Sequence, residues 1–124
     1  MRPVISIIDD DPSVREGTMD LLNSMGLAAE AFERANDFLN SNGPHRTSCL
    51  IADVQMPGMT GLELHNRLVG SGNVIPTILI TAFPNDRDRT RALQNGVGWY
   101  LTKPFSENEL LACIREALKT DGRQ

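Results

Sequence analysis

The sequence has few cysteines, few aromatic residues and no long hydrophobic run. It contains two cysteines, one tryptophan, one tyrosine and four phenylalanines among 124 residues. Cys49 and Cys113 are far apart in apolar surroundings, which favours two small core residues and, with them, a reducing, cytoplasmic location. No apolar stretch approaches the ~18 residues of a membrane span, so we expect no contact with a membrane. The apolar stretch that follows Pro3 is too short for a signal peptide and ends in charge.

Basic residues are also fewer than acidic residues. Twelve Lys and Arg residues face sixteen Asp and Glu residues, which gives a net charge of −4. Because binding to the phosphates of DNA depends on Lys and Arg, this balance argues against DNA binding by this segment itself. Hydrophobic residues make up 40% and charged residues 23%, as is ordinary for a folded globular protein. The length suits a single domain, which we place at residues 3–119, with residues 120–124 as a tail or the start of a linker.

Predicted strands and helices alternate along the chain. Short apolar runs predict strands, and apolar residues at helical spacing predict a helix after each of them. The predicted strands cover residues 4–8, 28–32, 49–53, 77–81 and 99–101; the helices cover 12–25, 35–39, a stretch that ends at 70, 86–95, and one that starts at 106. Residues 41–45 have the composition of a loop. Repeated βα units predict an α/β fold, a (βα)5 doubly wound parallel sheet of the flavodoxin-like type with strand order 2-1-3-4-5.

Two helix starts are marked by capping residues. Asp11 can accept hydrogen bonds from the free N–H groups of a first helical turn, and Pro12 fits the first helical position. Ser106 and Glu109 have the spacing of a capping box. Asp11 is therefore best explained as a helix cap.

Polar side chains collect where the predicted strands end. These residues are Asp9 and Asp10 after the first strand, Asp53 and Thr81 at the ends of the third and fourth, and Lys103 just past the fifth. The carboxyl ends of parallel strands meet at one edge of the sheet, which is where ligands bind in open α/β folds. We therefore expect three carboxylates, a hydroxyl and an ammonium group to lie together.

The groups at this edge are those that phosphoryl transfer needs. Two carboxylates about 4 Å apart repel each other by roughly 4 kcal/mol at an effective dielectric constant of about 20, so three of them need cations nearby. Lys103 supplies one positive charge, and oxygen ligands of this kind suit Mg²⁺. With both cations in place, Asp53 is predicted to be a nucleophile toward a phosphoryl group, with the Thr81 hydroxyl helping to neutralise the product.

Four segments resemble the receiver domain of bacterial two-component response regulators. They are Ile7–Asp11, Asp53–Gly61, Ile80–Ala82 and Leu101–Phe105, and the resemblance extends over about residues 3 to 119. The resemblance implies that Asp53 is phosphorylated by the phosphohistidine of a sensor histidine kinase.

The resemblance also implies a cofactor and a set of contacts. Mg²⁺ would be bound by Asp10, Asp53 and the backbone carbonyl of Gln55, with Asp9 assisting, largely through water. Lys103 would contact the phosphoryl group, and the peptide bond that follows it, to a proline, would be cis, as this family usually has it.

A signalling switch, and not an enzyme, is the implied function. Thr81 would turn toward the phosphoryl oxygen, and Tyr100 would rotate inward to fill the vacated space. The helix at 86–95 has a thin apolar face, so we expect it to be loosely held. The face formed by this helix, the fifth strand and the last helix would be the output surface. It is either a solvated surface or the site of a phosphorylation-dependent homodimer, paired through Arg87, Arg89, Arg91, Glu107, Glu109 and Glu116.

The sequence leaves open what the switch controls. The resemblance is strongest to the subgroup with a C-terminal helix-turn-helix domain, and no such domain is recognisable in this sequence. The chain is then either a fragment, with transcription controlled and DNA bound only through the absent domain, or a single-domain regulator that acts by protein contact.

Two other functions match parts of this pattern. One is a metal-dependent phosphatase with an Asp-x-Asp nucleophile, for which Asp9 and Asp11 have the spacing. The other is a flavin or nucleotide binder on the same fold, which three aspartates in the first loop argue against because they would repel a phosphate.

Overall fold

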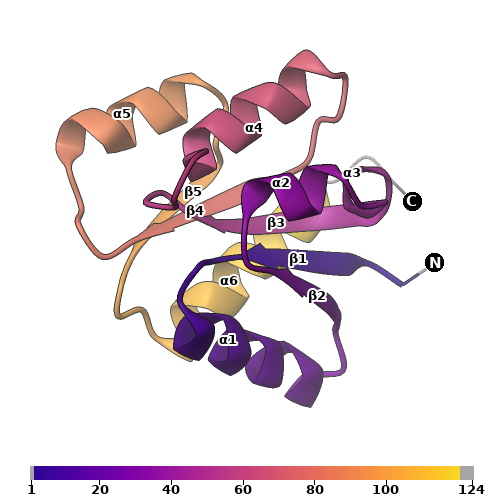
Figure 1. Cartoon of the computed structure of the whole chain (residues 1–124). Coiled ribbons are helices and arrows are strands. Elements are labelled where there is room, and N and C mark those ends of the chain that lie inside the picture. The colour runs from indigo at the N-terminus through magenta and orange to yellow at the C-terminus, as the bar shows by residue number, and fades with distance from the viewer. Residues whose placement is uncertain (1, 121–124) are drawn as a thin grey trace.

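Five short strands form a central sheet, and helices cover both of its faces (Figure 1). The computed structural model describes residues 2–120. The strands are β1 (Val4–Ile8), β2 (Ala28–Phe32), β3 (Thr47–Asp53), β4 (Thr77–Thr81) and β5 (Trp99–Thr102). The helices are α1 (Pro12–Ser24), α2 (Ala35–Leu39), α3 (Gly43–Arg46), α4 (Gly61–Gly70), α5 (Asp86–Gln94) and α6 (Glu107–Thr120).

All paired strands are parallel, and their order is β2-β1-β3-β4-β5. This confirms the predicted α/β fold and strand order. The register pairs Asp53 with Ile80 and Thr81 with Thr102, so the carboxyl ends of β3, β4 and β5 are nearly level. The polar residues that end these strands are therefore delivered to one edge.

The hydrophobic core lies in two layers, one on each face of the sheet. α1 and α6 cover one face, and α2, α4 and α5 cover the other (Figure 1). Successive residues of one strand belong to different layers: Ile7 packs in the layer of α1 and α6, and Ile8 in the other. This is why the central strands have continuous apolar runs. In α5, Ala92 is the single buried residue, in agreement with the expected thin apolar face.

Helix starts follow local signals in the sequence. The Asp11 side chain accepts a hydrogen bond from the backbone N–H two residues later, at 2.9 Å, and caps α1 as predicted. Ser106 and Glu109 exchange hydrogen bonds of 3.0 Å at the start of α6, which confirms that capping box. Thr60 and Glu63 form another capping box at α4, which was not predicted.

The prediction for residues 41–45 is wrong, because this segment runs into a one-turn helix, α3. Pro44 sits in its first turn, where a missing N–H is harmless, and Ser41 Oγ accepts a hydrogen bond from Gly43 N at 2.9 Å. Two strands are also longer than predicted. β3 begins at Thr47 and β5 ends at Thr102.

Cys49 is buried, Cys113 is only half-buried, and the two are not joined by a disulfide. Within residues 2–120, no helix has the length and apolar character needed to cross a bilayer. Residues 121–124 of the expected tail lie outside the described residues.

Candidate functional site

Asp53 ends β3, a strand that is buried along its whole length. Its carboxylate is held from two sides: the Gln55 backbone N–H donates to Oδ1 at 3.0 Å, and Lys103 Nζ donates to Oδ2 at 2.8 Å. Its backbone is closely packed against Gly61 at the start of α4, where an added Cβ would lie 2.5 Å from the Asp53 carbonyl oxygen. The sheet and α4 together thus fix the position of this carboxylate.

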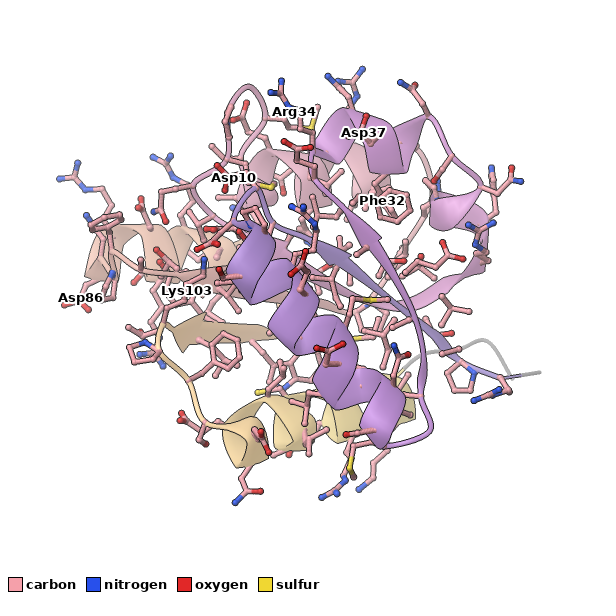
Figure 2. All side chains as sticks on the ribbon, turned by 60° about the horizontal axis from the view of Figure 1, so that its bottom comes forward. Asp10, Phe32, Arg34, Asp37, Asp86 and Lys103 are labelled. Atoms are coloured by element: carbon pink, nitrogen blue, oxygen red, sulfur yellow. The ribbon has the colours of Figure 1, made fainter. Side chains whose placement is uncertain are left out.

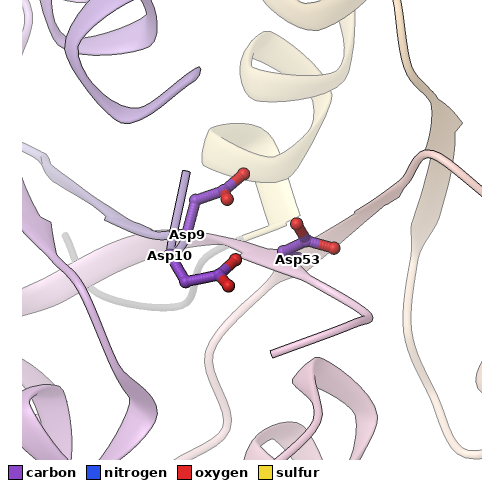
Figure 3. A group of neighbouring side chains, drawn as sticks. All are labelled: Asp9, Asp10 and Asp53. Carbon is purple, nitrogen blue, oxygen red and sulfur yellow. The ribbon is translucent and has the colours of Figure 1, made fainter. Parts of the chain in front are cut away.

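Asp9 and Asp10 lie beside Asp53, on the loop that follows β1. Asp9 is fully buried, and its Oδ1 accepts the backbone N–H of Asp11 at 2.9 Å. Asp10 is exposed. Oxygens of Asp9, Asp10 and Asp53 lie within 4.8 Å of one another, and Figure 3 shows the three carboxylates gathered at one place. The loop is fastened to α1 by Arg15 Nη1, which donates to the Asp9 carbonyl oxygen at 2.8 Å.

Lys103 reaches the same cluster from the end of β5. Its backbone N–H donates to the Thr81 carbonyl oxygen at 2.7 Å, which extends the sheet by one hydrogen bond. Its Nζ lies 2.8 Å from Asp53 Oδ2 and 3.0 Å from Asp9 Oδ2. Figure 2 shows Lys103 and Asp10 at the same end of the sheet. The Lys103–Pro104 peptide bond is cis, as the resemblance implied.

Burial and charge act in opposite directions on these groups. Burial raises the pKa of Asp9 above the usual 3.8, although its hydrogen bond from Asp11 and the Lys103 charge act against this. Burial also lowers the pKa of Lys103, but its hydrogen bond with Asp53 and its ion pairs with Asp53 and Asp9 outweigh that effect and raise the pKa above 10.5. Lys103 is therefore a permanent cation in the pocket, while burial shifts Asp9 toward its neutral form.

The donor set of the cluster fits a hard divalent cation. Asp9 Oδ2 is buried and has no hydrogen bond, although it forms an ion pair with Lys103. One ammonium group cannot balance three carboxylates, so the pocket keeps an excess of negative charge. Carboxylates, a backbone carbonyl and water are the ligands that Mg²⁺ takes in proteins. The exposed Asp10 leaves the open side that hydrated Mg²⁺ needs.

Thr81 lies beside Lys103 at the acidic cluster, Tyr100 lies beside Thr81, and neither is part of the cluster. Thr81 is fully buried; its Oγ1 donates to Gln55 Oε1 at 2.7 Å and accepts from Phe83 N at 3.0 Å. The Tyr100 hydroxyl lies near Thr81 and the Asn85 backbone, buried and without a hydrogen bond in the described part of the chain. Burial raises the pKa of Tyr100 above 10.0.

The side chain of Asp11 is directed to helix α1. It is exposed, caps α1, and is absent from the cluster formed by Asp9, Asp10 and Asp53. The Asp-x-Asp interpretation needs Asp11 beside Asp9 in the pocket. The structure therefore provides no second carboxylate for that phosphatase mechanism.

Two contacts were not predicted, one beside the site and one at the opposite, amino-terminal end of β4. The first is the Gln55 side chain on Thr81, described above. The second is His65 of α4, a buried ring whose Nε2 lies 3.0 Å from the Asn95 carbonyl oxygen and whose Nδ1 lies 3.2 Å from Thr77 Oγ1. Because Asn95 is the C-cap of α5, His65 ties that end of α5 to α4 and β4. No pattern in the sequence distinguishes His65 from a surface histidine.

Comparison with known proteins gives the family. Residues 5–115 match the response regulator receiver domain. Response regulator protein TodT of Pseudomonas putida is 41% identical over 121 residues, which cover 98% of this chain and 53% of TodT. Transcriptional regulatory protein FixJ of Azorhizobium caulinodans is 34% identical over 120 residues, covering 97% of this chain and 57% of FixJ. The solved structure of response regulator StyR is 39% identical with a TM-score of 0.90, covering 98% of this chain and 61% of that one.

The chain spans about half the length of the curated relatives that it matches. These relatives are named as regulators and not as enzymes. Receiver domains generally use Mg²⁺ at an acidic pocket, and this chain has such a pocket in Asp9, Asp10 and Asp53. The family match, the sheet order and the acidic pocket agree, and the chain belongs to the response regulator receiver domains, which are phosphorylation-activated signalling domains of two-component systems.

Proposed function

We propose that this domain accepts a phosphoryl group on Asp53 from the phosphohistidine of a sensor histidine kinase, with Mg²⁺ bound beside it. The observation that carries this is the ion pair between Lys103 Nζ and Asp53 Oδ2, at 2.8 Å, inside a cluster of three carboxylates. A cation in contact with the nucleophile is also in position to neutralise a phosphoryl oxygen once that group is transferred.

The reaction is an in-line displacement at phosphorus. An Asp53 carboxylate oxygen forms a bond to phosphorus, and the bond from phosphorus to the histidine nitrogen breaks. The imidazole leaves with the electron pair of that bond and is neutral once it carries one proton. Lys103 stays hydrogen-bonded to the site throughout, because the charges of Asp53 and Asp9 keep it protonated against the effect of burial.

The metal would be held by residues already assembled at the edge of the sheet. Asp10, Asp53 and the backbone carbonyl of Gln55 would bind it directly. Asp9 would act through water, since its Oδ2 already pairs with Lys103 at 3.0 Å. When bound, Mg²⁺ supplies positive charge to the phosphoryl oxygens and to the crowded carboxylates.

The signal would leave through Thr81, Tyr100 and α5. A phosphoryl group adds a charge of roughly −1.5 to −2. The Thr81 hydroxyl, which lies beside Tyr100, would donate a hydrogen bond to that group. α5 buries only Ala92, so its packing is weak enough to respond. The face of α5, β5 and α6 is the proposed output surface. A second copy of the domain would bind this surface through the exposed arginines of α5, whereas Glu116 on α6 already accepts a hydrogen bond from Trp99.

The groove between α1 and α6 is the proposed contact for the kinase. It has a volume of about 550 Å³ and is lined by Val14, Leu21, Pro104 and Phe105, with Lys103 at its border. Because Lys103 also borders the phosphoryl site, a protein that brings a phosphohistidine to Asp53 would contact this groove. Its apolar lining suits the surface of another protein.

We also propose how the chain is divided, what its output is and where the protein works. Residues 3–119 form the receiver domain, and residues 120–124 a tail or the start of a linker. The output is transcription through a DNA-binding domain outside this chain, supported by the name of the FixJ relative. The alternative is a regulator that acts by protein contact alone. The cytoplasm is the proposed compartment, since a phosphohistidine kinase domain and a reduced pair of cysteines fit it.

Labelling with acetyl phosphate and Mg²⁺ tests the nucleophile. The wild-type domain should gain one base-labile phosphoryl group, and Asp53→Asn should gain none. Asp37→Asn is the matched control, since Asp37 is exposed on α2 (Figure 2). Full labelling of Asp53→Asn would refute the assignment. In the same samples, the ring signals of Tyr100 in NMR spectra should shift with labelling, and unchanged signals would refute the proposed switch.

A further inference from the structure

The Thr81 hydroxyl already has a hydrogen-bond acceptor. Its Oγ1 donates to Gln55 Oε1 at 2.7 Å, and it accepts the backbone N–H of Phe83 at 3.0 Å. A threonine hydroxyl has a single proton and two lone pairs. In this arrangement the Thr81 hydroxyl donates its proton to Gln55 Oε1, and one of its lone pairs accepts a hydrogen bond from the loop after β4.

We propose that the Gln55 side chain competes with the phosphoryl group for the Thr81 proton, and so limits how strongly phosphorylation engages Thr81. This rests on the proposed function, in which Thr81 donates to a phosphoryl oxygen on Asp53. One proton does not make two full hydrogen bonds. The bond to Gln55 Oε1 therefore has to break before Thr81 can turn to the phosphoryl group.

The position of Gln55 suits a competitor that can be displaced. Its backbone N–H donates to Asp53 Oδ1 at 3.0 Å, so its main chain is fixed relative to the phosphorylated carboxylate. Gln55 is exposed, so water replaces Thr81 as the hydrogen-bond partner of its side chain once the bond breaks. Breaking the bond from Thr81 to Gln55 has a modest net cost, because one neutral hydrogen bond is lost and water partly replaces it. Gln55 then adjusts the response of the switch and does not block it.

The competition has a local reporter in Phe83. The Phe83 N–H donates to Thr81 Oγ1, so a rotation of Thr81 removes or redirects that acceptor. Phe83 belongs to the exposed loop that leads into α5, and its side chain is 72% exposed. The amide signal of Phe83 therefore reports on Thr81 directly, separately from the binding of any ligand at Asp53.

A double-mutant cycle with beryllofluoride and saturating Mg²⁺ tests the competition. Beryllofluoride is the probe because it occupies the place of a phosphoryl group on a carboxylate. Gln55→Met removes the acceptor and keeps the side-chain length, and should tighten beryllofluoride binding by roughly threefold to tenfold. Thr81→Val removes the hydroxyl and keeps the shape. In the Thr81→Val background, Gln55→Met should have no effect on binding, because no proton is left to compete for.

The Phe83 amide signal and two controls complete the experiment. Gln55→Met should move the Phe83 amide signal of the unliganded domain, and Thr81→Val should remove its dependence on beryllofluoride. Gln94→Met, an exposed glutamine on α5, should leave beryllofluoride binding unchanged. Mg²⁺ affinity without beryllofluoride is measured for every variant, so that all beryllofluoride titrations are made at saturating Mg²⁺.

The possible outcomes separate this inference from the proposed function. Unchanged or weaker binding in Gln55→Met, or equal tightening with and without the Thr81 hydroxyl, overturns the competition while leaving Asp53 as the phosphoacceptor. If the wild-type domain and Asp53→Asn both fail to bind beryllofluoride, the proposed function is overturned, and this inference with it.

Discussion

Lys103 Nζ and Asp53 Oδ2 lie 2.8 Å apart, although fifty residues separate them in the sequence. The parallel sheet creates this contact, because β3 and β5 both end at the same edge on either side of β4. The contact places a permanent positive charge on the proposed nucleophile and leaves the other carboxylates of the pocket without full compensation. The pocket is thus poised for a second cation and for an incoming phosphoryl group.

Replacing Lys103 should separate Mg²⁺ binding from phosphoryl transfer. Lys103→Met removes the charge and keeps most of the side-chain length, so the carboxylates become more negative as a group. Mg²⁺ affinity should be unchanged or higher, while the rate of labelling by acetyl phosphate should fall on the order of 100-fold, as for the loss of a donor to a transition-state oxygen. Mg²⁺ titration and single-turnover labelling measure the two effects.

Lys119→Met provides the matched control for that change. Lys119 is exposed in the last turn of α6, far along the chain from the pocket, and its replacement should alter neither quantity. A marked loss of Mg²⁺ affinity in Lys103→Met would contradict the role given to Lys103, because it would mean that the lysine supports the metal.

The buried carboxylate of Asp9 should make stability depend on pH. Its pKa is raised in the folded protein, chiefly by burial, so the folded state binds this proton more tightly than the unfolded chain does. The stability that comes from protonating Asp9 is complete below the usual pKa of 3.8 and is lost as pH rises through the higher folded value. At neutral pH, ionised Asp9 therefore destabilises the metal-free domain.

Asp9→Asn should remove this destabilisation of the metal-free domain at neutral pH. Without Mg²⁺, its free energy of unfolding near pH 7 should exceed that of the wild type by about 1 kcal/mol, and the difference should shrink on acidification. Urea denaturation across this pH range measures it. Asp11→Asn is the control in the same loop, since Asn caps a helix as well as Asp does. Lower stability of Asp9→Asn at neutral pH would show that its ion pair with Lys103 outweighs its burial.

The fold could be predicted from the sequence because its signals are local. Strands such as β1 are covered on both faces, so the run Ile5–Ile8 is apolar or small throughout. Caps such as Asp11 act over two or three residues and are visible in the sequence. The single turn of α3 was missed, because four residues that include Gly43 and Pro44 are compositionally a loop.

The members of the acidic pocket could also be predicted, but two side-chain contacts outside it could not. Strand ends converge in any parallel sheet, so Asp53 and Lys103 were expected at one edge before any distance was known. The bond from Thr81 to Gln55 depends on side-chain rotamers across two strand ends. The contact of His65 with Asn95 depends on how α4 packs on α5. Neither leaves a periodic or compositional pattern.

Two glycines in helices should respond in opposite ways to the same substitution. Gly61 starts α4 against the end of β3, and a Cβ there would lie 2.5 Å from the Asp53 carbonyl oxygen and 2.9 Å from Leu79 Cδ2. Gly17 lies within α1, where an added Cβ would meet nothing within 4 Å. Both are thus helical positions that differ in the space around them.

Gly61→Ala should destabilise the domain by about 1 to 3 kcal/mol, because backbone of β3 or α4 has to shift to admit the methyl group. Gly17→Ala should stabilise it by about 0.5 to 1 kcal/mol, because alanine loses less backbone entropy in a helix. Urea denaturation compares the two, and acetyl phosphate labelling adds a functional measure. Since the shift in Gly61→Ala falls on Asp53, its labelling rate should drop while that of Gly17→Ala does not. Equal stability changes in the two variants would contradict the close packing of α4 on the phosphoacceptor strand.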